Sequence, residues 1–412
     1  MKAYSDSVIE EIIINESIIT VFQPILSIKK RSLVGLEALT RGYYNNKIIM
    51  PDSLFALASA AGLTVDLDRL CRKKALETFS SNKSRLDKDI ILFLNFDASI
   101  IDQGVVGSGI LLSSVNGVGI NPNSVAIEIN ESVVTDIDSL QTFISLHRSY
   151  GFIIAMDDIG AGHSNLNRVD ITRPDFLKID RTLVKDLDKE YYKQEVFKSL
   201  INLARNTGSL VVAEGVERVE EAIAALDFGV DMIQGFHFSE PREISSIPFD
   251  NLTGRMENVA SVFKEHALQR ITLKNIQDRE YEAILNSVIN ELKDLRPADF
   301  DKKLGEVITR HGYLECIYIL DESAIQISHT ICNQTMLSAR TRPAFRPAPC
   351  GTDHSLKDYY YLLAGTGMKK CVTEPYISLA SGNLCTTISA YFENAYRQKF
   401  IICIDTNSNS AI

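Results

Sequence analysis

Acidic, amide and basic side chains recur at one kind of position in this sequence, directly after short apolar runs that are typical of buried strands. The residues at these positions are Glu37, Asn95, Glu128, Asp157, Asp158, Lys178, Glu214 and Gln234. A single acid after a strand is usually a helix cap or a turn residue. Caps and turns do not explain why so many strands end in a polar residue. In an α/β barrel these strand ends converge on one mouth, where the active sites of this architecture lie.

Carboxylates that gather at one mouth repel each other in a partly dry site, so they need protons or cations to coexist. Metal ions are the better explanation here. An all-oxygen ligand set without His or Cys favours Mg²⁺ or Mn²⁺ over zinc. We therefore predict that divalent ions are held by Glu37, Glu128, Asp157, Asp158 and Glu214.

Asp157 and Asp158 are adjacent, so on a continuing strand their side chains would point to opposite faces. Both reach the mouth only if the backbone turns there, and the following Ile159-Gly160-Ala161-Gly162 supplies that freedom. Such a pair suits a site with two metal ions, which clamps the attacking and leaving oxygens of a displacement at phosphorus.

Two basic residues are candidates for contact with a phosphate. Arg41 follows Glu37 by four residues, so the two side chains share a face of an extended chain, and a guanidinium suits a phosphate oxygen. Lys178 and Asp180 share a face likewise, which places a cation where it could orient the attacking water or offset charge on phosphorus. A structural ion pair between Lys178 and Asp180 explains their spacing equally well.

The elements that must position these residues alternate between short apolar runs and longer amphipathic stretches over residues 16–240. The predicted strands are Ile19–Leu26, Leu33–Thr40, Ile90–Phe96, Ser124–Ile129, Phe152–Asp157, Phe176–Ile179, Leu210–Ala213 and Met232–Phe236. The predicted helices include Ser53–Ala61, Leu67–Phe79, Ile137–Ser149, Glu190–Asn206 and Glu217–Leu226. This series fits one closed α/β barrel. An open doubly wound sheet is the alternative, but no Gly-x-Gly-x-x-Gly follows the first strand.

The pattern changes after Pro241. A long polar helix is predicted over Val259–Leu295, and its apolar stripe suits packing on a neighbouring domain at least as well as a coiled coil. From Phe300 onward, apolar runs alternate with Gly, Pro and Asn, which indicates a small α+β domain on an antiparallel sheet. We expect a barrel over 1–250, a connector helix over 251–298 and a regulatory domain over 299–412.

An ordered series of motifs resembles the EAL-domain cyclic di-GMP phosphodiesterases. The motifs are Phe22-Gln23-Pro24-Ile25, Glu37-Ala38-Leu39-Thr40-Arg41, Leu94-Asn95-Phe96-Asp97, Glu128-Ile129-Asn130-Glu131, Asp157-Asp158-Ile159-Gly160-Ala161-Gly162-His163-Ser164, Leu177-Lys178-Ile179-Asp180, Glu214-Gly215-Val216-Glu217 and Gln234-Gly235-Phe236. The resemblance covers about residues 10–245. It implies a modified TIM-type (β/α)8 barrel whose first strand runs antiparallel, and hydrolysis of cyclic di-GMP to the linear dinucleotide pGpG.

The resemblance also implies roles for individual residues. The implied metal ligands, for two ions of Mg²⁺ or Mn²⁺, are Glu37, Asn95, Glu128, Asp157, Asp158 and Glu214, of which Glu37, Asp158 and Glu214 are also catalytic. Lys178 would be the catalytic lysine, and Arg41, Gln23 and Gln234 would contact substrate. Supporting or regulatory roles are implied for Glu131, Asp180 and Glu217, with Glu131 in a control element linked to dimerisation.

This chain departs from the family's usual Phe, Thr and Tyr at Ile159, Ala161 and His163. All three lie in the loop after the double aspartate. These departures therefore concern efficiency and regulation rather than the chemistry.

The segments 351–361 and 375–382 resemble PAS-like or Cache-like sensor domains more loosely. This resemblance implies a small-molecule sensor of unknown ligand or a dimerising module. A domain whose tyrosines are only core residues is the structural alternative.

Bulk composition limits the classes of partner. The chain has 412 residues and a net charge of −10, with 53 acidic and 43 basic residues, so its surface has no general attraction for DNA or RNA. The polar N-terminus and the lack of a long apolar run predict a cytoplasmic protein without a membrane span. Seven cysteines without CxxC pairs favour buried free thiols, with a redox or metal-sensing role as the alternative.

Two other functions compete with hydrolysis of cyclic di-GMP. A receptor that binds the nucleotide without turnover typically lacks a metal ligand, and every metal position is filled here. A glycosidase needs only two carboxylates, which leaves the Asn, Lys and remaining acids unexplained.

Overall fold

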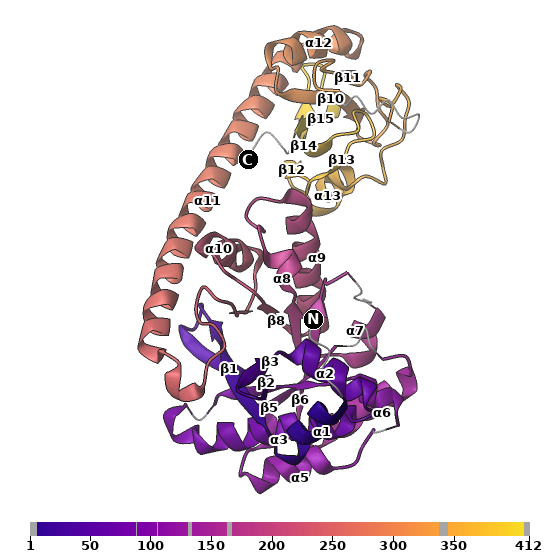
Figure 1. Ribbon diagram of the computed structural model, residues 1–412. Helices are drawn as coiled ribbons and strands as arrows, with labels where there is room; N and C mark the ends of the chain where they lie inside the picture. Colours follow the sequence, from indigo (N-terminus) through magenta and orange to yellow (C-terminus); the bar gives the residue numbers. More distant parts are fainter. Residues whose placement is uncertain are drawn as a thin grey trace. The chain divides into compact units, whose positions relative to one another are not determined.

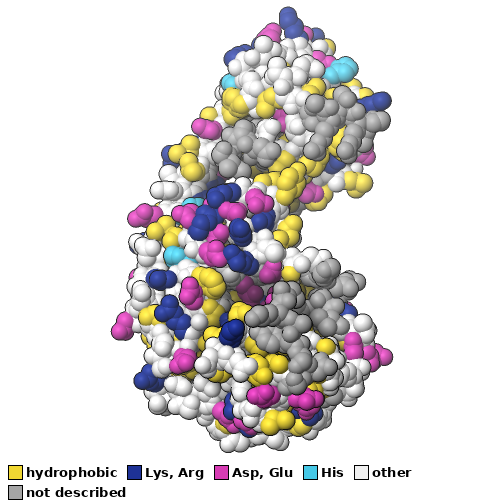
Figure 2. All heavy atoms as spheres, viewed as in Figure 1, with side chains coloured by type: hydrophobic (Ala, Val, Ile, Leu, Met, Phe, Trp, Pro, Cys, Tyr) yellow, Lys and Arg dark blue, Asp and Glu magenta, His cyan; other side chains and the backbone are white. Residues whose placement is uncertain are grey.

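The structure, a computed structural model, describes residues 6–87, 89–104, 106–130, 134–162, 167–337 and 345–407. Its internal contacts divide the chain into two compact units, Met1–Gln269 and Arg270–Ile412. Within the described residues, no helix combines the length and the apolar character that a membrane span requires. Basic and acidic side chains intermingle on the face shown in Figure 2.

The first unit is built on a closed barrel. Its strands are β1 (Ile18–Ser27), β2 (Ser32–Tyr44), β4 (Ile91–Phe96), β5 (Val125–Ile129), β6 (Ile153–Ile159), β7 (Phe176–Ile179), β8 (Leu210–Ala213) and β9 (Met232–Ile233), with β3 (Lys47–Ile49) in a hairpin with β2. Neighbours from β2 round to β9 are parallel, whereas β1 is antiparallel to both β2 and β9 and closes the ring. The predicted barrel and its antiparallel first strand are confirmed.

Helices surround these strands, as Figure 1 shows for α3, α5 and α6. The helices are α1 (Asp6–Ile14), α2 (Pro51–Ala60), α3 (Thr64–Ser81), α4 (Ser99–Asp102), α5 (Ile110–Gly117), α6 (Ile137–Ser149), α7 (Asn167–Thr172), α8 (Arg181–Val184), α9 (Tyr191–Thr207) and α10 (Val219–Phe228). Outward-facing strand residues such as Leu92, Ile127 and Ile154 pack against apolar helix residues such as Phe143 and Phe197 in one core. Burial of these faces holds the helices on the barrel.

The long helix predicted after the barrel begins ten residues earlier than expected, because α11 spans Phe249–Leu292. Its first turns place Leu252, Met256 and Val259 in the core of the first unit. That packing outweighs the low helix propensity of Gly254. The boundary between the units, after Gln269, falls inside this helix.

The second unit is an antiparallel sheet with helices on both faces, α11 and α12 on one and α13 on the other. Its elements are β10 (Leu314–Asp321), β11 (Ile331–Cys332), β12 (Lys370–Val372), β13 (Tyr376–Ile377), β14 (Leu384–Glu393), β15 (Lys399–Asn407), α12 (Phe300–Arg310) and α13 (Asp358–Thr366). The strand order is β11-β10-β15-β14-β12, with β13 beside β14. The predicted apolar stripe of the long helix, including Leu285, Val288 and Leu292, packs here against α12 and the sheet.

The prediction that the cysteines are buried free thiols is wrong at two positions and partly wrong at a third. Cys316 on β10 and Cys332 on β11 face each other in the antiparallel register and form a disulfide. Cys350 is free but exposed, while Cys71, Cys371, Cys385 and Cys403 are free and buried. Residues 16 positions apart become partners only through strand pairing, which cysteine spacing does not reveal.

Candidate active site

The inside of the barrel consists of an apolar layer below a polar layer. The apolar layer is formed by Ile25, Phe93, Ala126, Ala155, Phe176, Val212 and Met232. Two residues further along each parallel strand, on the same face, come Asn95, Glu128, Asp157, Lys178, Glu214 and Gln234. On the antiparallel β1 the order is reversed, so Gln23 precedes Ile25 by two and pairs in register with Glu37 of β2. Strand alternation alone therefore brings the predicted residues into one ring.

Lys178 lies at the centre of this ring and is completely buried. Its Nζ is 2.6 Å from Glu128 Oε1, 2.6 Å from Glu214 Oε1, 3.1 Å from Asp157 Oδ1 and 3.5 Å from Glu37 Oε2. Burial alone would lower the pKa of Lys178, but the four carboxylates, Asp157 foremost, raise it well above its usual value. The ammonium is therefore held charged at the site.

Glu37 is fixed by amide side chains. Asn95 Nδ2 donates to Glu37 Oε1 at 3.1 Å, and Gln234 Nε2 donates to Glu37 Oε2 at 2.5 Å. Gln234 Nε2 also lies 3.0 Å from Gln23 Oε1, and Gln23 donates in turn to the carbonyl oxygen of Ser239. Burial favours the neutral form of Glu37, but Lys178 and these amides outweigh it and lower its pKa. Gln23 and Gln234 thus orient a charged carboxylate in this structure.

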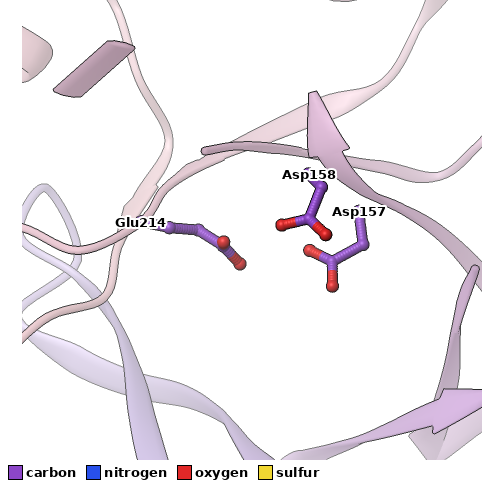
Figure 3. A group of neighbouring side chains, drawn as sticks. All are labelled: Asp157, Asp158 and Glu214. Carbon is purple, nitrogen blue, oxygen red and sulfur yellow. The ribbon is translucent and has the colours of Figure 1, made fainter. Parts of the chain in front are cut away.

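The double aspartate reaches the mouth through a backbone irregularity. Asp158 has φ +55°, and the pairing of β6 with β7 shifts register between Met156 and Ile159. The turn predicted for the following glycine loop thus begins at Asp158 itself. Asp157, Asp158 and Glu214 point toward one another (Figure 3), and one oxygen from each lies within 4.8 Å of the others. A left-handed backbone conformation costs free energy for a residue other than Gly or Asn. The surrounding contacts must therefore hold Asp158 in this conformation.

The ring carries more negative charge than Lys178 balances. Burial, and then neighbouring carboxylates, raises the pKa of Glu128 well above its usual value, and burial does the same for Glu214. Burial and Asp157 together raise the pKa of Asp158 to about 6. Crowding of buried like charges therefore favours the binding of protons or cations at this ring.

Divalent cations fit this donor set. Among the described residues, Glu128 Oε2 is buried and has no hydrogen-bond partner. The converging atoms are all oxygens, which suits hard ions such as Mg²⁺ and Mn²⁺. Glu37, Asn95, Glu128, Asp157, Asp158 and Glu214 are therefore together at one mouth, as the sequence predicts for metal ligands.

A second acidic group differs from the ring at the barrel mouth. Asp186, Asp188 and Glu221 also bring three carboxylate oxygens together. Arg218 lies among them, 2.5 Å from Asp188 Oδ1 and 3.2 Å from Glu221 Oε1. Arg218 thus occupies the space among these carboxylates, and Lys189 Nζ lies 2.9 Å from Asp186 Oδ1.

Arg41 and a cavity lie beside the ring. Arg41 is half-buried on β2, where it donates to the carbonyl oxygen of Thr40 at 2.8 Å. A cavity of ≈390 Å³ shares Glu37 and Asn95 with the ring and extends between Thr40, Phe55 and Arg72. It is large enough to receive part of a nucleotide.

Two predicted residues, Asp180 and Glu217, do not lie among the ring's carboxylates. Asp180 caps α8 by accepting a hydrogen bond from Thr182 N at 2.9 Å. Glu217 pairs with Arg181 at 2.6 Å, and both side chains are largely accessible to solvent. Glu131, like His163 and Ser164, lies outside the described residues.

Asn130 is a site residue that our residue-by-residue analysis missed. Its Nδ2 donates to Asp158 Oδ2 at 2.7 Å. The available signal was its position two residues after Glu128, on the same face of the extended chain. Asn130 helps hold Asp158 in its unusual conformation.

Gly235 offers a test of how the ring is positioned. A Cβ at this residue would lie 2.2 Å from the carbonyl oxygen of Val216 and 2.3 Å from its nitrogen. Because both atoms belong to the backbone, Gly235→Ala must displace the chain beside Gln234. We expect a loss of about 1–3 kcal/mol in the free energy of unfolding, measured by urea denaturation.

Gly254→Ala is the matched control for Gly235→Ala. Gly254 lies within α11, and a Cβ there meets nothing within 4 Å. The control should gain about 0.5–1 kcal/mol, because alanine is the better helix former. Equal stability of the two variants would contradict the close approach at Gly235.

Comparison with known proteins places the first unit in one family. The sequence profile of the EAL domain matches residues 6–241. "Uncharacterized EAL-domain containing protein YkuI" of Bacillus subtilis is 27% identical over 329 residues, covering 77% of this chain and 78% of that protein. "Cyclic di-GMP phosphodiesterase PdeL" of Escherichia coli is 28% identical over 225 residues, covering 53% of this chain and 61% of PdeL.

Solved structures of EAL-domain proteins resemble this chain as well. The crystal structure of B. subtilis YkuI, in complex with cyclic di-GMP and calcium, superposes with a TM-score of 0.78 at 25% identity, covering 97% of this chain and 98% of that one. A manganese and cyclic di-GMP complex of Klebsiella pneumoniae BlrP1 gives a TM-score of 0.50 at 29% identity, over 55% of this chain and 56% of BlrP1.

Proposed function

The chain belongs to the EAL-domain family, and from this premise we propose that it is a metal-dependent phosphodiesterase that hydrolyses cyclic di-GMP to pGpG. One observation carries the proposal. Lys178 is buried among four carboxylates, beside the converging oxygens of Asp157, Asp158 and Glu214. A purely structural ion pair needs one acid, whereas this excess of carboxylates suits a site that also holds cations.

The proposed reaction is a displacement at phosphorus. Water adds to the phosphorus of one phosphodiester, the bond to the ribose 3′ oxygen breaks, and that oxygen takes up a proton. Two divalent ions, Mg²⁺ or Mn²⁺, would be held by the six ring ligands and would supply an activated water and charge stabilisation. Lys178 holds its ammonium where it can orient the attacking water or stabilise charge on the phosphoryl oxygens.

The remaining ring residues keep the ligands in place. Gln234 and Asn95 donate to the two oxygens of Glu37, which leaves that carboxylate little freedom to rotate. Asn130 restrains Asp158 in the same way. Such preorganisation lowers the reorganisation needed during the reaction.

Substrate contacts are proposed for Arg41, Gln23 and Gln234. Arg41 shares the strand face of Glu37 and, within the described residues, forms no ion pair, so its guanidinium is available to a phosphate. The cavity beside Glu37 and Asn95 would receive a guanine or ribose. We assign the second unit a regulatory role that acts through the continuous helix α11. We also propose that the protein forms a homodimer.

Turnover with and without metal tests the proposed function. Purified protein with Mg²⁺ or Mn²⁺ should convert cyclic di-GMP to pGpG. The conversion is monitored by ion-exchange chromatography. Excess EDTA should stop the conversion, and added Mn²⁺ should restore it, because the acids of the ring cannot act together without cations. Nucleotide that stays bound and uncleaved in both metals would identify a receptor instead.

A further inference from the structure

The two faces of the sheet in the second unit differ in chemistry. One face is apolar: Phe400, Ile402 and Ile404 of β15 pack in the core with α11 and α12. The opposite face alternates with it and has two parts: an apolar part, where Leu320 and Ile401 pack with Leu363 of α13, and a polar part with Asp405 of β15 and Thr387 and Ser389 of β14, all buried. Apolar side chains would suffice to cover the whole of this face, so its polar part requires an explanation.

A cavity of ≈100 Å³ lies beside Asp405 in this part of the second unit. The residues that line it include Tyr318, Arg346, Lys357, Tyr359, Tyr376 and Asp405. Its volume is several times the ~30 Å³ share of one water molecule in the liquid. The cavity therefore suits a small organic molecule.

Asp405 is the charged group on the inner wall. It is 2% exposed and accepts hydrogen bonds from Thr387 Oγ1 at 2.7 Å and Ser378 Oγ at 3.5 Å. No basic side chain in the described part of the chain forms an ion pair with it. Burial raises the pKa of Asp405 to about 7. A buried carboxylate that lacks a cationic partner is stabilised when a cation enters beside it.

The aromatic residues of the cavity suit a cation as well. Tyr318, Tyr359 and Tyr376 line the cavity together with Asp405. Their orientations are fixed by partners: Tyr359 OH lies 2.6 Å from His354 Nδ1, and Tyr376 OH lies 2.5 Å from Thr387 Oγ1. Aromatic faces attract ammonium groups.

Two basic residues, Arg346 and Lys357, line the same cavity and are exposed. Neither forms an ion pair among the described residues. Because they are exposed while Asp405 is buried, the cavity presents positive charge at its outer part and negative charge within. A polyamine would be repelled by the outer part, and a simple carboxylate would be repelled by Asp405.

We propose that this cavity binds a small zwitterion of amino-acid size, with its ammonium group against Asp405 and the tyrosines and its carboxylate at Arg346 and Lys357. Each end of the ligand meets the opposite charge. The guanidinium of Arg346 matches a carboxylate in a bidentate manner. The site is separate from the barrel mouth and does not depend on the phosphodiesterase proposal.

Matched fragments test this binding site. Isothermal titration calorimetry on the full chain at pH 8 would compare L-alanine, L-serine, L-proline, β-alanine and γ-aminobutyrate with ethylamine and propionate, which each carry one of the two charges. At least one zwitterion should bind at least ten-fold more tightly than either fragment. No zwitterion binding at 10 mM, or equal affinity for ethylamine, would overturn the proposal.

Two variants test the contacts to the two ends of the ligand separately. Asp405→Asn keeps the side-chain shape and the acceptor for Thr387, and it should weaken the zwitterion at least ten-fold. Arg346→Ala, at an exposed position, should weaken the zwitterion while leaving ethylamine binding unchanged. Asp299→Asn, exposed and outside the cavity, is the control and should bind as the unmodified protein does. Unchanged zwitterion affinity in a folded Asp405→Asn protein would also overturn the proposal.

Discussion

Replacing Asp157 by Asn should lower the turnover of cyclic di-GMP by at least about 10³-fold while leaving the protein folded. Asp157 lies 3.1 Å from Lys178 Nζ, and its oxygens converge with those of Asp158 and Glu214. The amide keeps the shape of the side chain but loses the charge that metal ligation needs. In metal-free protein, one carboxylate fewer reduces the repulsion within the ring, so the melting temperature should stay the same or rise.

The measurements are steady-state turnover with Mn²⁺ and thermal unfolding in EDTA. Asp170→Asn, at an exposed position of α7, is the control and should match the unmodified protein in both. If Asp157 served only as a cap for the following loop, Asn would replace it well. A folded Asp157→Asn protein with near-normal turnover would therefore rule out its role as a metal ligand.

Replacing Lys178 by Met should abolish measurable turnover and also destabilise the metal-free protein by about 3–5 kcal/mol. Met fills a similar volume but leaves Glu128 and Glu214 without the ammonium that lies 2.6 Å from each. The pKa values of both acids are already raised above their unfolded values, and losing Lys178 raises them further. Stability of the variant is therefore greatest at low pH, where these acids are protonated, and is lost as the pH rises.

Urea denaturation in EDTA at pH 5.5 and pH 8 measures this effect. The double variant Lys178→Met with Glu128→Gln should be more stable than Lys178→Met alone at pH 8, because one unpaired charge is removed with the cation. Lys185→Met, on the surface after α8, should change little. A Lys178→Met protein as stable as the unmodified one at pH 8 would show that the ring acids are not balanced by this lysine.

The barrel and most of the ring could be predicted because each rests on local pattern. Most ring residues on the parallel strands follow an inward-facing apolar residue by two positions, as Glu128 follows Ala126 and Lys178 follows Phe176. Strand alternation converts that spacing into a shared face, and barrel closure joins the faces. The predicted strand Phe176–Ile179 agrees with β7 residue for residue.

What the pattern missed depends on contacts between distant segments. The left-handed conformation of Asp158 depends on the register shift beside β7 and on Asn130. Cys316 and Cys332 meet only because β10 and β11 pair. Glu217 pairs with Arg181 at the start of α8, and this partner was not apparent from the motif that contains Glu217.

Hydrolysis in ¹⁸O-labelled water tests the central claim most directly. Protein, cyclic di-GMP and Mn²⁺ are incubated in H₂¹⁸O, and the nucleotide is recovered for mass spectrometry. We predict pGpG with one ¹⁸O atom on its 5′ phosphate, because water attacks phosphorus and the ribose 3′ oxygen leaves. Recovery of intact, unlabelled cyclic di-GMP from a protein that binds both nucleotide and metal would contradict the assignment of this carboxylate ring as a phosphodiesterase site.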